Sequence, residues 1–205
     1  MLYKDQLIPT GSLNDTGAEL RMNIPKSHRI GIEVDAGWRI SDKLSWLATA
    51  AISDNKIFDF IEYYQVYDSD WNWLREKSQN LGNTKIAKSA AAIFSNNFSY
   101  RPINKLEFSL LSKYVSRQYL DNTEAKDRSI APYFINNMRA TYSFAALGLQ
   151  QIDCNLQVNN IFNREYSTSG YTWGQKFENR NERYYYNFYS PQATRHLLLG
   201  FNIRF

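Results

Sequence analysis

The sequence predicts an all-β fold: an antiparallel up-and-down transmembrane β-barrel segment of about eight strands. Three observations predict it. Apolar and polar residues alternate with a period of two along several segments. The connections between these segments alternate between short and long. Tyr, Phe and Trp make up 16% of the chain, and several of them fall near the ends of the alternating segments.

The alternation is clearest in residues 29–40. A strand places successive side chains on opposite faces, so a period of two gives one apolar and one polar face, whereas a helix would mix the two sets. None of the residues on the polar parity is a large apolar one. The apolar parity consists of Ile30, Ile32, Val34, Ala36, Trp38 and Ile40.

The same split recurs along the chain and defines the other predicted strands. Asn96 interrupts the apolar parity of one strand, Leu47 and Ala51 fall on the polar parity of another, and Leu198 is an exception in the last. The further strands are predicted at residues 2–8, 44–52, 94–100, 106–110, 138–144, 152–158 and 196–205.

Short turns are predicted at residues 41–43, 101–105 and 145–150, and long polar loops at residues 9–27, 55–85, 118–132 and 167–193. Short periplasmic turns and longer extracellular loops are the wiring of an outer-membrane barrel. If the last strand ends in the periplasm, the even number of strands places both chain ends there.

Composition excludes several other classes of protein. No run of about 18 apolar residues predicts a transmembrane helix, and a barrel tolerates the mean hydropathy of −0.53 because its strands alternate. The net charge of +4 forms no basic stripe, so no nucleic-acid partner is expected. The single Cys154 excludes an internal disulfide and a multi-cysteine zinc site. No metal motif, cofactor motif or catalytic motif is present, and we expect neither a cofactor nor an enzyme.

A soluble antiparallel barrel or sandwich also alternates. Strands of about 10 residues and long connections favour the membrane interpretation. So do aromatic residues at the predicted strand ends, which suit interfacial girdles. These are Trp38, Trp46, Tyr100, Tyr142 and Tyr166.

Residues 158–166 (VNNIFNREY) resemble the V-x-N-L-F-N-x-x-Y stretch that precedes the final strand of TonB-dependent outer-membrane receptors. A Tyr-rich loop, residues 190–195 (SPQATR) and a final strand that ends on Phe205 follow in the same order. Residues 3–7 (YKDQL), 111–115 (LSKYV) and 118–122 (QYLDN) look like strands of Bacteroidetes-type members of this family. The resemblance covers essentially the whole chain.

The resemblance implies that residues 1–205 are the C-terminal part of a larger barrel of the 22-strand type, closed by a plug. Family members take up scarce nutrients such as ferric siderophores or cobalamin, and in Bacteroidetes also glycans, at the Gram-negative outer membrane. A TonB box links them to the TonB complex. We find no plug, TonB box or signal peptide in the sequence. We therefore expect a fragment that does not transport alone, with outer-membrane lipid, the remaining strands, the plug and the TonB complex as partners.

Substrate contacts are expected from the extracellular loops, with residues 167–190 the richest candidate. Aromatic and arginine side chains hold planar or anionic ligands, although Tyr-rich loops also simply pack on their neighbours. The predicted substrate-binding residues are Tyr171, Trp173, Arg180, Arg183, Tyr184, Tyr185 and Tyr186.

The loop at residues 55–85 is similar, with Tyr63, Tyr64, Tyr67, Trp71 and Trp73. Its carboxylates, among them Glu62, are too irregularly spaced for a calcium loop. On the last strand, Phe201, Ile203 and Phe205 resemble the signal read by the barrel-assembly machinery, which adds such a strand to a sheet edge.

Two other functions remain open at this point. A complete small eight-stranded barrel would serve as an outer-membrane structural or adhesion protein, and a soluble barrel would bind a ligand. Pairing between the first and last strands would identify the complete small barrel.

Overall fold

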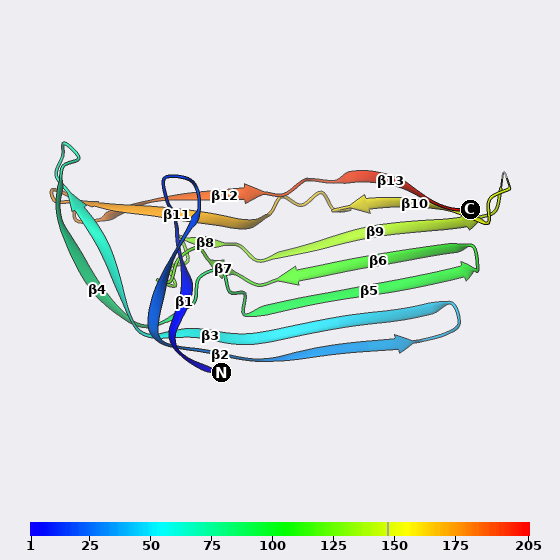
Figure 1. The fold of residues 1–205 in the computed structure, drawn as a ribbon, viewed down its shortest axis with the longest axis horizontal. Coiled ribbons are helices and arrows are strands. Elements are labelled where there is room, and N and C mark those ends of the chain that lie inside the picture. The colour runs from blue at the N-terminus through cyan, green and yellow to red at the C-terminus, as the bar shows by residue number, and fades with distance from the viewer. Residues whose placement is uncertain (147) are drawn as a thin grey trace.

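The computed structural model describes residues 1–146 and 148–205 of the chain, and within them every regular element is a strand (Figure 1). No described helix is long and apolar enough to cross a membrane. The strands are β1 (Leu2–Leu13), β2 (Glu19–Arg39), β3 (Leu44–Tyr67), β4 (Trp73–Lys85), β5 (Ala92–Ile103), β6 (Leu106–Val115), β7 (Gln118–Tyr119), β8 (Ser129–Ile130), β9 (Tyr133–Phe144), β10 (Gln151–Asn159), β11 (Ser167–Phe177), β12 (Arg183–Pro191) and β13 (His196–Arg204).

One sheet carries the strands that the alternation predicts, in the order β1-β2-β3-β5-β6-β9-β10-β13. All neighbours on this path are antiparallel, so the all-β, antiparallel prediction is confirmed. In the described part of the chain β1 and β13 do not pair, and the sheet stays open. The closure that a complete eight-stranded barrel requires is therefore not present.

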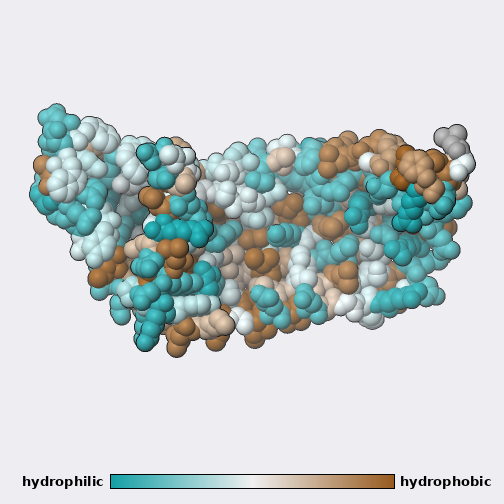
Figure 2. All heavy atoms as spheres, viewed as in Figure 1, coloured by the Kyte–Doolittle hydropathy of each residue, from teal (hydrophilic) through white to brown (hydrophobic). Residues whose placement is uncertain are grey.

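The apolar parities of adjacent strands meet on one face of this sheet. Cross-strand pairs join one residue from each of seven strands into a continuous apolar row, and the rings of Trp46 and Phe98 stack with centroids 5.6 Å apart. Figure 2 shows part of the apolar surface over β13, where Leu199 is 64% exposed. The row consists of Trp38, Trp46, Phe98, Leu110, Met138, Val158 and Leu197.

Asn96, which breaks the predicted alternation of β5, belongs to a second row on this face. It pairs with Ser112 of β6, and Ser112 pairs with Asn136 of β9. The Ser112 hydroxyl donates a hydrogen bond of 2.7 Å to the Asn136 carboxamide. Three polar residues thus lie side by side, and Ser112 and Asn136 are buried despite their position on the apolar face.

The long connections are hairpins rather than loops, which corrects the sequence-based expectation. Residues 9–27, 55–85 and 167–193 lie largely in the hairpins β1–β2, β3–β4 and β11–β12, and residues 118–132 contain the small hairpin β7–β8. The predicted turns at residues 41–43 and 101–105 are short, as expected. The third predicted turn, 145–150, includes residue 147, which is outside the described residues. Figure 1 shows the hairpins at one end of the sheet and the short turns at the other.

The two chain ends do not lie at the same end of the sheet, which also differs from the sequence-based expectation. Met1 lies beside Arg29, because the Arg29 amide donates to the Met1 carbonyl at 3.0 Å. Arg204 lies at the short-turn end, where its carbonyl accepts from the Gln150 amide. β1 therefore pairs with the hairpin half of β2, and within the described part of the chain residues 30–39 of β2 have β3 as their only strand partner.

Both buried hydrophobic clusters lie near the hairpins, at the end of the sheet opposite the short turns. One cluster joins Ile8 and Ile24 of β1–β2 to Ile57 and Phe60 of β3 and to Ile86. Burial of an isoleucine side chain stabilises a fold by roughly 1.5–3 kcal/mol. A second cluster holds Val115, Tyr133 and Ile135, and Tyr166 packs against it with its ring 4.9 Å from that of Tyr133. Tyr166 thus packs against this cluster, and the girdle role expected for it stays a prediction.

Candidate functional site

The β11–β12 hairpin carries all the predicted substrate-binding residues on or beside its two strands. Its antiparallel register pairs Tyr171 with Phe188, Trp173 with Tyr186, Gly174 with Tyr185 and Gln175 with Tyr184. Paired residues share a face of the ribbon, and faces alternate along each strand. The register therefore separates Tyr184 and Tyr186 from Arg183 and Tyr185.

The first face is an aromatic ladder. The rings of Tyr171 and Phe188 stack with centroids 4.8 Å apart, and those of Trp173 and Tyr186 with centroids 5.7 Å apart. Trp173 and Tyr186 are each nearly half exposed. Aromatic cross-strand pairs contribute about 0.5–1.5 kcal/mol each beyond area burial, so the ladder also rigidifies the hairpin.

The ladder leads to a pocket of about 300 Å³, which we call the aromatic pocket. Trp71, from the turn between β3 and β4, meets the Phe177 ring edge to face at 5.0 Å. The Arg180 guanidinium donates to the Tyr184 hydroxyl at 2.6 Å. Of the described residues that line this pocket, none is acidic. They are Ser69, Trp71, Gln175, Phe177, Asn179, Arg180, Tyr184 and Tyr186.

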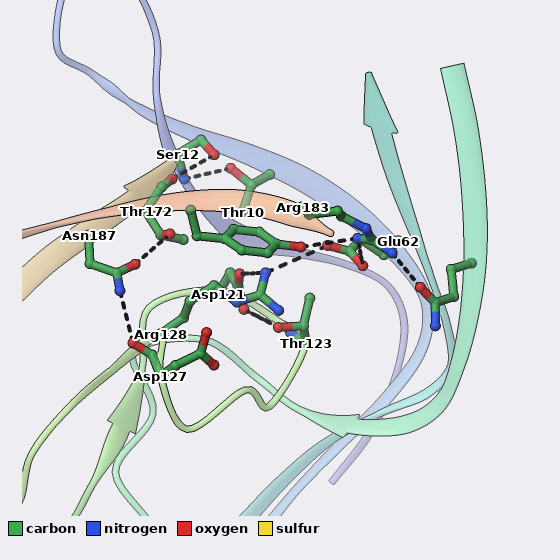
Figure 3. Close-up of polar contacts among 12 residues, drawn as sticks. Thr10, Ser12, Glu62, Asp121, Thr123, Asp127, Arg128, Thr172, Arg183 and Asn187 are labelled. Carbon is green, nitrogen blue, oxygen red and sulfur yellow. Dashed lines mark hydrogen bonds and ion pairs between the residues drawn. The ribbon is translucent and has the colours of Figure 1, made fainter. Parts of the chain in front are cut away.

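The second face of the hairpin borders a pocket of about 270 Å³, the charged pocket, which is shown in Figure 3. Glu62 of β3 accepts from Arg183 at 2.6 Å and lies 3.7 Å from Arg128. Arg128 donates to Asp121 at 2.9 Å. These four residues come from β3, β12 and the segment between β7 and β8, so the pocket exists only where the hairpins meet.

Aromatic rings cover both guanidinium groups of the charged pocket. Arg128 lies 3.8 Å above the centroid of Tyr185, and Arg183 lies 3.7 Å above that of Tyr64. Burial raises the pKa of the Asp121 carboxyl above its usual value, although the charge of Arg128 opposes the shift. Burial also raises the pKa of Tyr185. Burial opposes the charge of Arg183, but the hydrogen bonds to Glu62 and Tyr185 and the electrostatic attraction of these two groups together outweigh it and raise the pKa of Arg183.

Backbone contacts hold the segment between β7 and β8 in place. The side-chain carboxamide of Asn122 donates to the Pro9 carbonyl at 2.8 Å and accepts from the backbone amide of Ala87 at 2.8 Å. The Ser12 hydroxyl donates to the Thr172 carbonyl at 3.3 Å, which joins β1 to β11. β1 therefore serves as a wall of the charged pocket.

The structure divides the predicted substrate-binding residues between two sites. Arg180, Tyr184 and Tyr186 line the aromatic pocket, whereas Trp173, Arg183 and Tyr185 line the charged pocket. Tyr171 lies on the ladder beyond the aromatic pocket. Their roles in ligand binding stay a prediction.

Sequence reasoning missed Asp121, Arg128 and Gln175, and considered Glu62 only as a calcium ligand. Asp121 and Arg128 lie seven residues apart in a polar segment, and nothing local points to Glu62 or Arg183 as their partners. The sequence does point to Trp71, because it is one of the five Tyr and Trp residues in residues 55–85. No described group of three or more His, Cys, Asp or Glu side chains could hold a metal ion.

The last strand presents its predicted assembly residues to solvent. Phe201 and Ile203 of β13 pair with Cys154 and Ile152 of β10 on the apolar face. Phe201, Ile203 and Phe205 are 60%, 49% and 88% exposed. One edge of β13 pairs with β10, and the other has no strand partner among the described residues.

Solved structures of other proteins contain a similar fold. No protein-family model and no curated protein matches the sequence. Among solved structures, the siderophore receptor PiuA from Acinetobacter baumannii has a TM-score of 0.64 at 14% identity over 100% of this chain. The ferric yersiniabactin uptake receptor FyuA from Yersinia pestis has a TM-score of 0.63 at 16% identity over 99%. The ferric-catecholate import receptor Fiu from E. coli K12 has a TM-score of 0.61 at 14% identity over 100%.

The chain spans about a quarter of the length of these receptors, 25%, 26% and 24% respectively. At such identities the likeness establishes the fold, an antiparallel β-sheet like part of the barrel of these proteins. PiuA is described as a siderophore receptor, Fiu as an import receptor and FyuA as an uptake receptor.

Proposed function

We propose that the chain is the C-terminal part of the β-barrel of a TonB-dependent outer-membrane receptor of the Bacteroidetes type, which takes up a scarce nutrient such as a ferric siderophore or cobalamin. One observation carries the proposal: essentially the whole chain has the fold of about a quarter of the length of the receptors PiuA and FyuA, and it forms an open sheet with one apolar face. The motif of residues 158–166 supports placement before the final strand.

The two faces of the sheet suit a barrel wall. The apolar row suits contact with lipid, and the opposite parity of β2, which carries Glu33, Asp35 and Arg39, suits a wet lumen. Of the described strands, β13 and residues 30–39 of β2 each have a neighbour on one side only. Unpaired edges recruit further strands, so the partners proposed are the remaining barrel strands, the plug and, through the N-terminal part of the receptor, the TonB complex.

The hairpin layer supplies the receptor surface in this proposal. The predicted substrate-binding residues line or flank two pockets at the end of the sheet opposite the short turns. Phe201, Ile203 and Phe205 act as the assembly signal, because an exposed amphipathic strand pairs readily with a sheet edge during insertion.

Uptake of radioactive iron tests the proposal in cells. A strain that carries the receptor with this segment should accumulate a ferric siderophore in a TonB-dependent manner, and deletion of the TonB gene is the control. The 205-residue chain alone should give no uptake. TonB-dependent uptake by the isolated chain, or recovery of the receptor that carries this segment outside the outer-membrane fraction, would contradict the proposal.

A further inference from the structure

A cluster of basic side chains, which we call the basic patch, lies at the hairpin end of the apolar face of the sheet. It consists of Lys4 on β1, Lys26 and His28 on β2, and Lys56 on β3. The register pairs Lys4 with Lys26, and His28 with Lys56, and paired residues share a face. Ile30, two residues after His28, begins the apolar parity of β2, so the basic patch directly continues the apolar face.

The basic patch carries more positive charge than its own carboxylate balances. Asp54 lies 3.1 Å from Lys56 and 3.1 Å from His28, so one carboxylate serves two partners. Within the described part of the chain, Lys4 and Lys26 form no ion pair. Like charges directly opposite one another on paired strands destabilise the pair. The fold therefore places two uncompensated ammonium groups side by side, which an anion would stabilise.

Phe58 of β3 holds part of the basic patch in place. Lys26 Nζ lies 5.1 Å from the centroid of the Phe58 ring, and the ring of His28 lies 5.3 Å from it. An aromatic face attracts a cation, so Lys26 is positioned although its side chain is exposed. The carboxylates that adjoin the patch in the sequence, Asp5 and Asp59, form no ion pair with its lysines among the described contacts.

The height of the basic patch follows from strand geometry. Lys26 and Trp38 are twelve residues apart on β2. At about 3.4 Å per residue and a tilt of about 40°, Lys26 is roughly 30 Å from Trp38 along the membrane normal. The apolar band of an outer-membrane barrel is about 25 Å tall, so the basic patch lies at the level of the lipid headgroups. The hairpin end is the extracellular side in the proposed function, so these headgroups belong to the outer leaflet.

We propose that the basic patch binds a phosphate group on the headgroup of an outer-leaflet lipid, through Lys4 and Lys26. Lysine binds phosphate as a point charge, and a phosphate monoester has enough charge and acceptor oxygens to bridge two ammonium groups. A lipid is favoured over a soluble anion, because its acyl chains would lie on the apolar face that begins at Ile30. The inference rests on the proposed function for its orientation in the membrane. It adds a defined headgroup site where that function requires only contact with the bilayer.

Native mass spectrometry of the receptor that carries this segment, delipidated in a neutral detergent, tests the basic patch. The probe is diphosphoryl lipid A, and the same lipid without its phosphates should bind far more weakly. A lysine near a charged lipid surface changes binding about fivefold, so Lys26→Gln should weaken binding by about that factor, and the Lys4→Gln/Lys26→Gln double variant roughly 25-fold. Because the two lysines repel each other, neither variant should unfold at a lower urea concentration than the parent protein.

Lys105→Gln is the matched control, because Lys105 is an exposed lysine in the short turn between β5 and β6, at the other end of the sheet. Its affinity for lipid A should be unchanged. Equal binding of the dephosphorylated lipid, or unchanged affinity in Lys26→Gln, would overturn the site. Inorganic phosphate that bound as tightly as lipid A would indicate a soluble anion and would overturn the assignment to a lipid. Loss of TonB-dependent uptake with lipid binding intact would count against the proposed function only.

Discussion

Gly11 is the position where β1 comes closest to the segment between β7 and β8. A Cβ atom there would lie 2.3 Å from the Leu120 carbonyl oxygen and 2.9 Å from the Asp121 Cα, and both are backbone atoms. The φ angle of Gly11 is +92°, which L residues rarely adopt. Because backbone cannot rotate away, alanine here forces β1 and the charged pocket apart.

The expected cost of Gly11→Ala has two parts. The positive φ contributes about 1–2 kcal/mol, and the steric overlap about 1–3 kcal/mol more. Gly17→Ala is a matched control, because Gly17 has a φ of +82° but a Cβ atom there would meet no heavy atom within 4 Å. It should cost only the first part.

Urea unfolding in detergent measures both variants, and hydrogen exchange locates the effect. Gly11→Ala should be about 1–3 kcal/mol less stable than Gly17→Ala, with faster exchange in residues 118–130. Equal destabilisation by the two variants, with no change in those residues, would refute the docking of β1 on this segment.

Three further predictions concern the charged pocket and the sheet wall. Arg128→Met leaves the Asp121 carboxylate buried without its closest cation, and should cost about 3–5 kcal/mol in urea unfolding, whereas Arg75→Met at the exposed pair with Glu178 should cost at most about 1 kcal/mol. The pKa of Asp121 is raised on folding, so its contribution to stability is fully present below the unfolded pKa of 3.8 and is lost as pH rises through the folded pKa. Asp121→Asn should remove that part of the pH dependence of the urea midpoint. An unchanged pH profile in this variant would contradict the raised pKa. Leu199→Arg on the apolar face of β13 should destabilise the chain in lipid by about 2–4 kcal/mol, and Asn202→Arg on the other parity by much less; equal losses would mean that the face does not meet lipid.

The alternation of residues predicts the wall well, because the side-chain period of a strand is two and a slip of one residue would turn every apolar side chain to the polar face. Trp38 and Trp46 fall on the same parity of their strands, and the structure pairs them directly. Leu47, which breaks the pattern, lies opposite Gly37 on the polar face, where the missing side chain leaves room for it.

The hairpins could not be predicted in the same way. β4 pairs with β3 along a polar, mostly exposed strand, so its residues show no alternation between core and solvent. Its strand character comes from the partner, because β-propensity depends strongly on context. The charged pocket is harder still, since Glu62, Asp121 and Arg183 are joined only when three hairpins meet.

The motif of residues 158–166 acquires a physical reason at Asn160. This residue directly follows β10, is 3% exposed and has a φ of +51°, which asparagine tolerates better than most residues. Its carboxamide donates to the Arg164 carbonyl at 2.8 Å and accepts from the Arg164 amide at 2.9 Å. Its own amide donates to the Asn137 carboxamide at 2.8 Å. One side chain thus turns the chain from β10 toward the hairpin that holds both pockets.

Replacement of Asn160 separates the two contributions. Asn160→Gly keeps the positive φ but loses three side-chain hydrogen bonds, two to Arg164 and a longer one of 3.4 Å to the Ala193 carbonyl. The two short bonds contribute about 0.5–1.5 kcal/mol each, so the variant should cost about 1–3 kcal/mol. Asn160→Ala loses the bonds and also meets the φ penalty of about 1–2 kcal/mol, so it should be the less stable of the two in urea unfolding. Because the turn orients β11, both variants should also speed hydrogen exchange in that strand. If alanine proved as stable as glycine, the backbone angle would not be the reason for asparagine at this position, and the turn would owe its shape to the sheet on either side.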